Sequence, residues 1–181
     1  MTAIAQLRTL LSRYEPADPH EVEFRTRMLA LAASGPRALA RESYDPGHFT
    51  ASAFVLSPDG GSLLLVLHRK LGLWLQPGGH VEPDDADLIA AARREAREEV
   101  GLGELELACD AIFDVDIHDI PAHGAPAHQH FDVRFLFRAP SLSCCAGSDA
   151  RDARWVALAE VAAVGSDASV MRAVNRMLAA S

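Results

Sequence analysis

The first quarter of the chain carries apolar residues at the spacing of amphipathic helices. One stripe runs from Ile4 to Leu11, and a second helical stretch covers about residues 20–33 before Ser34-Gly35-Pro36 interrupts it. We expect residues 1–45 to form an N-terminal helical extension. Such an extension either covers the sheet of the main domain or builds the interface of a homodimer, and the pattern favours covering.

From Phe49 onward the pattern changes to short apolar runs that are typical of strands. Residues 51–56 and 62–67 are two such runs, and the Ser-Pro-Asp-Gly-Gly segment between them predicts a β-hairpin. Three further strands and a closing helix are expected: strands over about residues 105–118, residues 128–138 and around Trp155, and a helix over about residues 167–179. We therefore predict one mixed α and β domain over residues 46–181, built around a sheet.

An alanine-rich helix is predicted from about Ala86 to Val100. It follows a glycine- and proline-rich loop, Gln76-Pro77-Gly78-Gly79. Asp84 or Asp85 suits the N-cap, and Gly101 stands where a C′ glycine belongs. This loop and helix hold the residues with the clearest chemical signal.

Composition adds two expectations about location. The hydrophobic fraction of 49% is ordinary for a globular protein, and no apolar run approaches the ~20 residues of a membrane span. The first residues lack the pattern of a secretory signal, so we expect a cytoplasmic protein without a membrane partner. The three cysteines show no CxxC spacing, and we interpret Cys109, Cys144 and Cys145 as structural or incidental thiols.

The formal net charge of -8 bears on the partners of the chain. Nucleic-acid binding depends on lysine and arginine that neutralise phosphates, so this charge argues against a nucleic-acid partner. A small substrate that carries phosphate therefore requires a local positive charge, and a metal ion is one way to provide it.

Three carboxylates fall on one face of the predicted helix. Glu95, Glu98 and Glu99 lie within an arc of roughly 100° when each residue turns by about 100°. Like charges at this spacing cost about 0.2–0.5 kcal/mol per pair, and a bound divalent cation would reverse that cost. Carboxylate oxygens suit Mg²⁺ or Mn²⁺. The alternative is a solvated acidic face that is helped by an ion pair between Arg94 and Glu98.

The same segment resembles the Nudix box, G x5 E x7 R E U x E E x G U. Residues 94–102, REAREEVGL, match its second half at every defined position if Ala96 counts as the small member of class U. The first half departs from the pattern. Counted from Gly79, the position of the first glutamate holds Asp85, and eight residues separate it from Arg94. We interpret this as a one-residue insertion before the helix, which leaves the role of Asp85 open.

The resemblance implies a member of the Nudix, or MutT-like, hydrolase family over about residues 47–160. It implies an α/β/α sandwich with a mixed sheet and water attack at phosphorus in a nucleoside diphosphate derivative or nucleoside triphosphate. Glu95, Glu98 and Glu99 would hold Mg²⁺, with Mn²⁺ as the alternative ion. The carbonyl of Gly79 would be a further ligand, and Glu98 or Glu99 would serve as general base. Arg94 would be structural.

Two later strands each place polar side chains on one face through their alternation. They are Asp114, Asp116 and His118 on the first strand, and His128, His130, Asp132 and Arg134 on the next. Because adjacent strands lie about 4.8 Å apart, we predict that His128, His130 and Asp132 line the substrate pocket, with Asp116 as a further candidate. The alternative is a solvated sheet face. A zinc site built on the HxH pair lacks a third ligand at familiar spacing.

Residues that flank the glycine-rich loop complete the predicted site. Arg69 and His80 lie in the segment HRKLGLWLQPGGH and would bring cations to the phosphate. Trp74 in this segment either stacks on a base or packs in the core, and Trp155 is assigned to structure.

Two rival functions share the fold that the resemblance implies. An isopentenyl diphosphate isomerase needs a catalytic cysteine, and no cysteine lies near Gly79. A sensor that binds nucleotide or ADP-ribose without cleavage is expected to have lost one of the three glutamates, and none is lost. The substrate itself stays open among ADP-ribose, dinucleoside polyphosphates, sugar nucleotides and oxidised nucleotides, because a fold does not determine a substrate.

Overall fold

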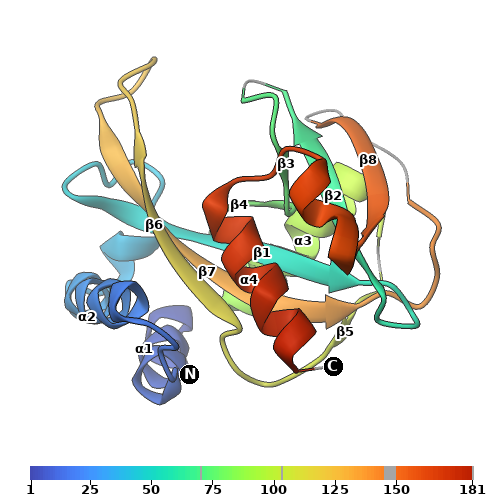
Figure 1. The fold of residues 1–181 in the computed structure, drawn as a ribbon. Coiled ribbons are helices and arrows are strands. Elements are labelled where there is room, and N and C mark those ends of the chain that lie inside the picture. The colour runs from blue at the N-terminus through green and yellow to red at the C-terminus, as the bar shows by residue number, and fades with distance from the viewer. Residues whose placement is uncertain (70, 103, 145–149, 181) are drawn as a thin grey trace. The chain divides into compact units, whose positions relative to one another are not determined.

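A computed structural model describes residues 1–69, 71–102, 104–144 and 150–180, and Cys145 lies outside them. The chain forms helices and a mixed sheet, as predicted (Figure 1). The helices are α1 (Ala3–Arg13), α2 (Pro19–Ala33), α3 (Leu88–Val100) and α4 (Ala168–Ala179), with short 3-10 helices η1 (Pro36–Leu39) and η2 (Leu158–Ala163). The strands are β1 (Gly47–Leu56), β2 (Ser62–His68), β3 (Trp74–Leu75), β4 (Gly78–His80), β5 (Glu106–Leu107), β6 (Asp114–Ile120), β7 (His128–Arg138) and β8 (Ala150–Ala157).

The fold divides into two compact units. The first contains residues 1–52, 79–92 and 111–135, and the second contains residues 53–78, 93–110 and 136–181. Strands β1 and β7 and helix α3 each continue from one unit into the other. Among the described residues, no helix has both the length and the hydrophobicity to cross a membrane.

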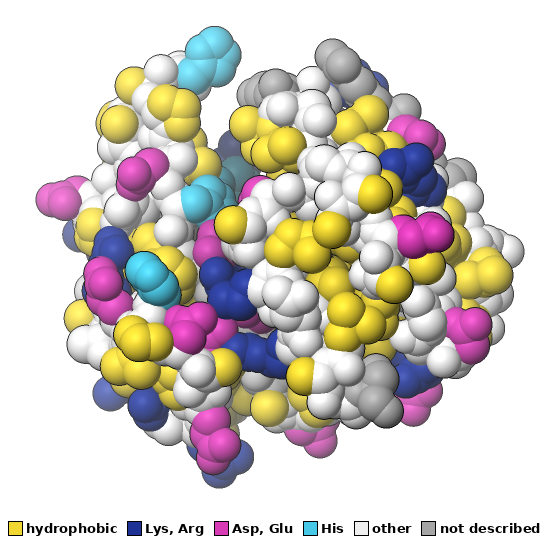
Figure 2. Space-filling view, viewed as in Figure 1, with side chains coloured by type: hydrophobic (Ala, Val, Ile, Leu, Met, Phe, Trp, Pro, Cys, Tyr) yellow, Lys and Arg dark blue, Asp and Glu magenta, His cyan; other side chains and the backbone are white. Residues whose placement is uncertain are grey.

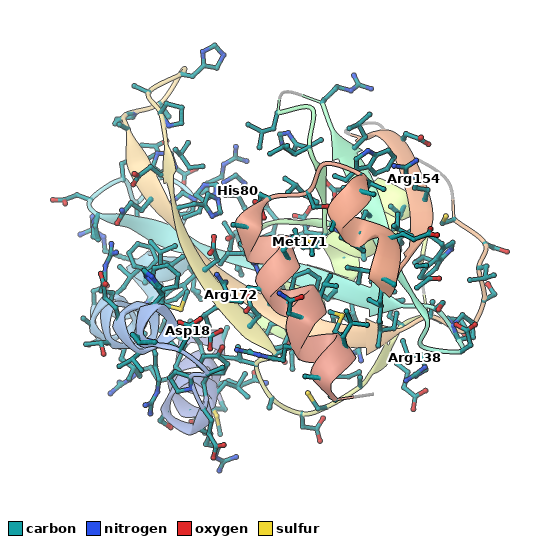
Figure 3. The ribbon with its side chains drawn as sticks, in the orientation of Figure 1. Asp18, His80, Arg138, Arg154, Met171 and Arg172 are labelled. Atoms are coloured by element: carbon teal, nitrogen blue, oxygen red, sulfur yellow. The ribbon has the colours of Figure 1, made fainter. Side chains whose placement is uncertain are left out.

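In the first unit, α1 and α2 pack on each other and α2 contacts β6 (Figure 1). Helix α2 begins with a regular cap, because the Asp18 side chain accepts a 2.9 Å hydrogen bond from the Glu21 N–H (Figure 3). Glu21 is fully buried, and its carboxylate accepts a hydrogen bond of 2.8 Å from the Tyr14 hydroxyl at the end of α1. The guanidinium of Arg27 lies over the Phe131 ring of β7, 5.7 Å from its centroid. The helical extension therefore covers strands, as the pattern favoured.

In the first unit, β7 has both β1 and β6 as neighbours. Strands β6 and β7 pair antiparallel, with Asp116 opposite Asp132 and His118 opposite His130. The start of β1 approaches β7 closely: the Gln129 N–H donates to the Pro46 carbonyl at 2.9 Å. A Cβ on Gly47 would lie 1.8 Å from the Gln129 carbonyl oxygen. Only glycine permits this approach.

In the second unit the strands run in the order β3-β2-β1-β7-β5, and β8 pairs with β2. The predicted hairpin joins β1 to β2, and Gly60 adopts a positive φ of 79° in its turn. The apolar side chains of β2 are buried, and α4 packs its own buried face through Val170, Val174 and Met177. Strand β8 and helix α4 confirm the elements that were predicted around Trp155 and over residues 167–179.

One predicted strand was wrong in its extent. The segment 105–118 forms two strands, β5 and β6. The Ala108 N–H bonds to the Leu136 carbonyl, and the Phe113 N–H bonds to the Arg134 carbonyl. Five residues on this side therefore face two on β7, and the surplus residues 109–111 are exposed. Apolar alternation alone does not reveal such an insertion.

The N-cap predicted for α3 was also wrong. The helix begins at Leu88, and the Asp87 side chain accepts a hydrogen bond of 2.8 Å from the Ala90 N–H. Asp85 instead accepts from the Glu82 N–H at 2.8 Å in the turn before the helix. The sequence analysis considered only Asp84 and Asp85 as caps, and the backbone of the turn places Asp87 there instead. At the other end Gly101 has φ 70°, as a C′ glycine should.

The cap yields a direct stability test. Asp87→Ala should lower the free energy of unfolding by about 1 kcal/mol, because it leaves an N–H of the first turn without an acceptor. The exposed Asp84 was an equal candidate on sequence, and Asp84→Ala is the matched control with an expected change near zero. Urea denaturation of both variants measures the difference. Equal losses would contradict the cap assignment.

Candidate functional site

Helix α3 holds the three predicted metal ligands in the second unit. One nitrogen of Arg94, Nη1, lies 2.8 Å from Glu95 Oε1 and 3.2 Å from Glu98 Oε2. The side chain of Glu95 is 15% exposed and that of Glu98 is 54% exposed. Arg94 thus pairs with two acids of the motif, as the resemblance implied, and it offsets their mutual repulsion.

The third acid of the helix binds the loop that precedes it. Glu99 Oε2 accepts a hydrogen bond of 3.3 Å from the Gly78 N–H, so the carboxylate is oriented toward the glycine-rich loop. On the adjoining face of α3, Ala92, Ala96 and Val100 are fully buried. Small residues on that face let the helix lie close to its neighbours, which places the carboxylates near the backbone of the loop.

This donor set fits a hard divalent cation by its chemistry. Three carboxylates from one helix face provide oxygen ligands, which is the preference of Mg²⁺ and Mn²⁺. In the described part of the chain, however, the three do not all come within 4.8 Å of one another. Arg94 holds two of them and the Gly78 N–H holds the third. The helical arc therefore predicted the shared face, while the pairing partners set the present side-chain directions.

The second predicted set of polar residues lies in the first unit, where an arginine is buried among aspartates. Arg134 Nε donates to Asp132 Oδ2 at 2.7 Å, and its two other nitrogens lie 3.1 Å from Asp114 and 3.4 Å from Asp116. All four side chains are buried or nearly so. Burial works to lower the pKa of Arg134, but the three carboxylates outweigh it and raise that pKa.

Asp132 is the centre of this network. Besides Arg134, it accepts hydrogen bonds of 2.9 Å from the hydroxyls of Thr50 and Ser52 on β1. The solvated-face alternative is wrong here, because Asp132 and Arg134 are each only 2% exposed. Since several donors already engage the carboxylate, this geometry favours a role in holding β1 against β7.

His118 extends the network toward the surface of β6. Its Nδ1 lies 3.2 Å from Asp116 Oδ2, and its side chain is 44% exposed. Burial acts to lower the pKa of His118, but the hydrogen bond that its ring donates to Asp116 and the charge of Asp132 together raise it. The aspartates thus favour protonation of His118, whereas the histidines beside it have other surroundings.

Four other histidine rings gather beside His118. The ring of His48 lies 4.9–5.1 Å, centroid to centroid, from the rings of His80, His128 and His130. The rings of His128 and His130 are 5.2 Å apart. Burial, followed by the charges of the neighbouring histidines, lowers the pKa of His130 to about 3. Burial, followed by the charge of His48, also lowers the pKa of His80 to about 4. His80 and His130 are therefore neutral at neutral pH.

Arg69 and Trp74 take different positions in the second unit. Arg69 is exposed directly after β2, so it is free of the core. Trp74 is buried, and the Arg154 guanidinium stacks 4.0 Å over its ring (Figure 3). The packing alternative for Trp74 therefore agrees with the structure. Acidic and basic side chains are interspersed on the face shown in Figure 2.

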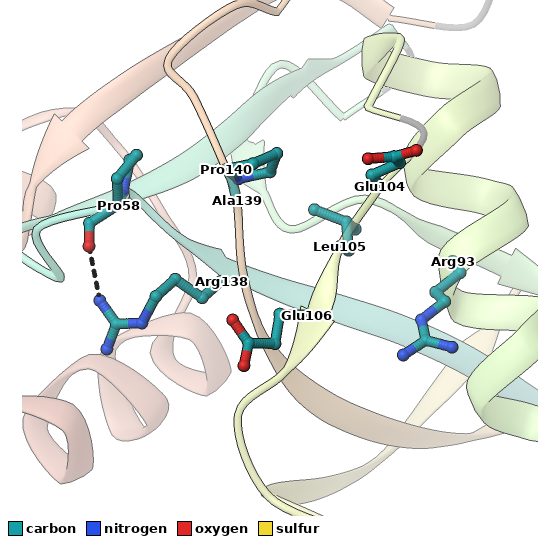
Figure 4. A pocket seen from close by; sticks show the side chains of 8 residues that line it. All are labelled: Pro58, Arg93, Glu104, Leu105, Glu106, Arg138, Ala139 and Pro140. Carbon is teal, nitrogen blue, oxygen red and sulfur yellow. Dashed lines mark hydrogen bonds between the residues drawn. The ribbon is translucent and has the colours of Figure 1, made fainter.

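A cavity of about 670 Å³ in the second unit holds none of the predicted ligands (Figure 4). Arg93, Glu104, Glu106 and Arg138 line it, together with apolar residues. Arg138 Nη1 donates to the Pro58 carbonyl at 3.0 Å, and Arg93 lies over the Phe137 ring at 5.4 Å. Both arginines are therefore engaged in contacts within the protein.

The loop, the carboxylate helix and the mixed sheet can be compared with known proteins. A family model described as the NUDIX domain matches residues 46–176. The chain belongs to the NUDIX family. No curated protein sequence matches it significantly. Membership confirms the predicted family and identifies this NUDIX protein as a hydrolase that acts on phosphorus-containing anhydrides.

Solved structures support the fold. The dihydroneopterin triphosphate pyrophosphohydrolase of E. coli is similar with a TM-score of 0.57 at 17% identity, over 74% of this chain and 96% of that one. A NUDIX-family hydrolase from Clostridium perfringens has a TM-score of 0.56 at 23% identity, over 79% and 100%. The NUDIX domain of Shewanella oneidensis NrtR, crystallised with ADP ribose, has a TM-score of 0.55 at 20% identity, over 81% and 92%.

The sequence predicted three of the four histidines that gather in the first unit and missed the fourth. The predicted His80, His128 and His130 come together in the first unit, but His48 was not among the candidates. His48 is separated from His128 by 80 residues and lies at the edge of a strand that was predicted to start later. A lone histidine with no motif around it offers no signal. Only the pairing of β1 with β7 reveals its neighbours.

The buried network should be essential for stability. Arg134→Met leaves three buried carboxylates without their cation and should cost about 3–5 kcal/mol of unfolding free energy. Arg134→Lys keeps the charge but loses the planar fork, so its loss should be smaller. Arg41→Met is the control, since Arg41 makes only a 4.0 Å exposed pair with Glu42 and should cost less than about 1 kcal/mol. Urea denaturation tests this, and a loss at position 134 as small as at position 41 would contradict it.

The histidine cluster predicts a pH dependence. His130 has a folded-state pKa of about 3, against an ordinary value of 6.5, so the unfolded chain binds its proton first on acidification. Stability should therefore fall as pH drops below about 6.5. When the pH is lowered from about 7.5 to about 5, the free energy of unfolding should fall in both proteins. The fall should be up to about 2 kcal/mol smaller in His130→Gln than in the unchanged protein. Urea denaturation in EDTA at both pH values measures this. Parallel losses in the two proteins would contradict a neutral His130.

Proposed function

We propose that this NUDIX protein is a divalent-metal-dependent hydrolase that cleaves the diphosphate linkage of a nucleoside diphosphate derivative or a nucleoside triphosphate. The observation that carries the proposal is the carboxylate face of α3. There Glu95 and Glu98 lie against one arginine nitrogen, and Glu99 lies against the glycine-rich loop. Mg²⁺ is the proposed ion, with Mn²⁺ as the alternative.

Each acid of α3 receives a role from its surroundings. Glu95 is half-buried beside Arg94, and Glu99 is half-buried beside Gly78, so both suit stable ligands that change direction little. Glu98 is more exposed and makes the longer of the two contacts with Arg94, so its carboxylate can turn toward a substrate at small cost. The carbonyl of Gly79 is a further proposed ligand. When bound, the cation would neutralise phosphate oxygens and lower the pKa of a bound water.

Arg94 keeps these acids ready for the reaction. Without its cation, the helix would carry three like charges in its last turns, where the helix dipole also disfavours acids. Arg94 reduces that repulsion, because one of its nitrogens lies against both Glu95 and Glu98. The general base in this proposal is Glu98 or Glu99, because either can accept a proton from a water near the phosphate.

Residues outside α3 would bind the substrate. His80, His128 and His130 offer rings that can stack on a base, and exposed Arg69 offers a cation for the phosphate. Asp132, predicted as a substrate contact, would act by holding the strand that carries His128 and His130. A small nucleotide is the proposed partner. The cytoplasmic location, the absence of a nucleic-acid partner and the homodimer remain predictions of the sequence.

Known proteins with this fold suggest compounds for a first test. Besides the ADP-ribose complex of NrtR, an Ap4A hydrolase of C. elegans is similar with a TM-score of 0.54 at 20% identity, over 73% of this chain and 95% of that one. We include both compound classes with sugar nucleotides, nucleoside triphosphates and oxidised nucleotides. Phosphate-coupled hydrolysis would be measured with Mg²⁺, with Mn²⁺ and with EDTA. Cleavage of at least one compound that EDTA abolishes supports the proposal.

A variant of α3 tests the metal site itself. Glu98→Gln should reduce metal-dependent turnover on the order of 100-fold or more, because it removes one ligand charge while the fold stays intact. Glu160→Gln is the matched control, since Glu160 is an exposed glutamate of η2 outside the site, and its turnover should be unchanged. Turnover of Glu98→Gln within a factor of two of the unchanged protein would count against the site. Ligand binding without any hydrolysis by the unchanged protein would instead favour a sensor.

A further inference from the structure

Three histidines of the first unit have the arrangement of a metal-binding site. One ring nitrogen from each of His48, His128 and His130 lies within 4.8 Å of those of the other two. Among the described residues, no other group of three histidines, cysteines or carboxylates meets this distance. The three come from two strands, β1 and β7, which are paired at the Gln129 N–H and the Pro46 carbonyl.

Hydrogen bonds to carbonyls determine which nitrogen of each ring is available. The Nδ1 of His48 lies 3.1 Å from the Ser43 carbonyl, and the Nδ1 of His128 lies 2.8 Å from the Pro126 carbonyl. A carbonyl only accepts, so each Nδ1 carries the proton and each Nε2 keeps its lone pair. Such outer contacts are the usual way in which proteins orient histidines that bind metals.

The Nε2 of His48 is the second, independent observation. His48 is 1% exposed, and this nitrogen is buried without any hydrogen-bond partner. An unsatisfied buried acceptor is destabilising, so a protein that retains one leaves a place for a donor, a water or a cation.

We propose that His48, His128 and His130 form a binding site for a transition-metal ion of Zn²⁺ type, separate from the carboxylates of α3. Imidazole nitrogens suit Zn²⁺, Co²⁺ and Ni²⁺, whereas Mg²⁺ selects oxygen ligands, so the chemistry of the two sites differs. Three histidines with one open position are a known ligand set for Zn²⁺. The fourth position would take water or a substrate oxygen, so metal binding is compatible with substrate contact by the same rings.

The site needs only a modest closure. Zn–N bonds of about 2.0–2.1 Å in a tetrahedron place the nitrogens about 3.4 Å apart. His128 and His130 are half-buried and sit at i and i+2 on β7, so rotation of their rings can bring the nitrogens in from the present separation. His48 cannot move as readily, because its ring is buried and held by Ser43. Gly47 supports this geometry, since any larger residue would push β1 away from Gln129.

Metal titration of the full chain tests the proposal. Zn²⁺ or Co²⁺ would be titrated into Glu98→Gln protein in excess Mg²⁺, and binding would be followed by calorimetry. Under these conditions the carboxylates of α3 should not contribute to the binding signal. We expect one equivalent to bind, with the visible spectrum of tetrahedral Co²⁺ and no thiolate band. His128→Gln and His130→Gln should each weaken binding on the order of 100-fold. The exposed His20 and His123 provide matched controls, and their glutamine variants should bind as before.

Folding and binding can be separated. His128 and His130 were chosen because they are less buried than His48, and circular dichroism with urea denaturation would show that each variant is folded. Equal Zn²⁺ affinity in the folded His128→Gln and His130→Gln proteins would overturn the proposal, as would binding lost equally with His123→Gln, or no binding at all. This test measures metal binding and not hydrolysis. The proposal for the carboxylate site and the proposal for this site can therefore be contradicted independently of each other.

Discussion

The guanidinium of Arg134 lies buried between three aspartates, and the strands that carry the histidines depend on it. Asp114 and Asp116 come from β6, and Asp132 comes from β7 beside the arginine itself. Asp132 in turn accepts hydrogen bonds from β1. One cation thus connects three strands through side chains as well as through the backbone. Buried charges of this kind are costly unless every partner is satisfied, which constrains strand register tightly.

That register has consequences for chemistry. Because β1, β6 and β7 are held in one alignment, His118 lies opposite His130, and His48 lies beside His128. His118 meets the aspartates and gains a raised pKa. His130, two residues from Asp132, meets mainly other rings, and its pKa falls to about 3. The same strands therefore raise the pKa of one histidine and lower the pKa of its neighbour on the paired strand.

Helix α3 also pairs an arginine with several acidic side chains. Its carboxylates repel one another, and Arg94 offsets the repulsion from within the motif. In the Arg134 network the guanidinium is buried and pairs with all three aspartates. On α3 the acids are half-buried or exposed, so an oxygen-seeking cation can still reach them. The two charge clusters thus differ in burial. The buried Arg134 network stabilises the fold, whereas the more exposed acids of α3 are the candidates for a reaction.

The family, the extent of the domain helices and the three glutamates of α3 could be predicted from sequence, because they depend on local spacing along one helix and loop. Periods of 3.6 and 2 residues also identified α2, β2, β7 and α4 closely. Local spacing predicted Asp84 or Asp85 as the cap where the structure has Asp87, and it missed the insertion that divides β5 from β6. The histidine cluster and the Arg134 network were decided by tertiary structure alone. Their members come from strands far apart in the chain, and only strand pairing, set by long-range packing and by the close approach at Gly47, brings those side chains together.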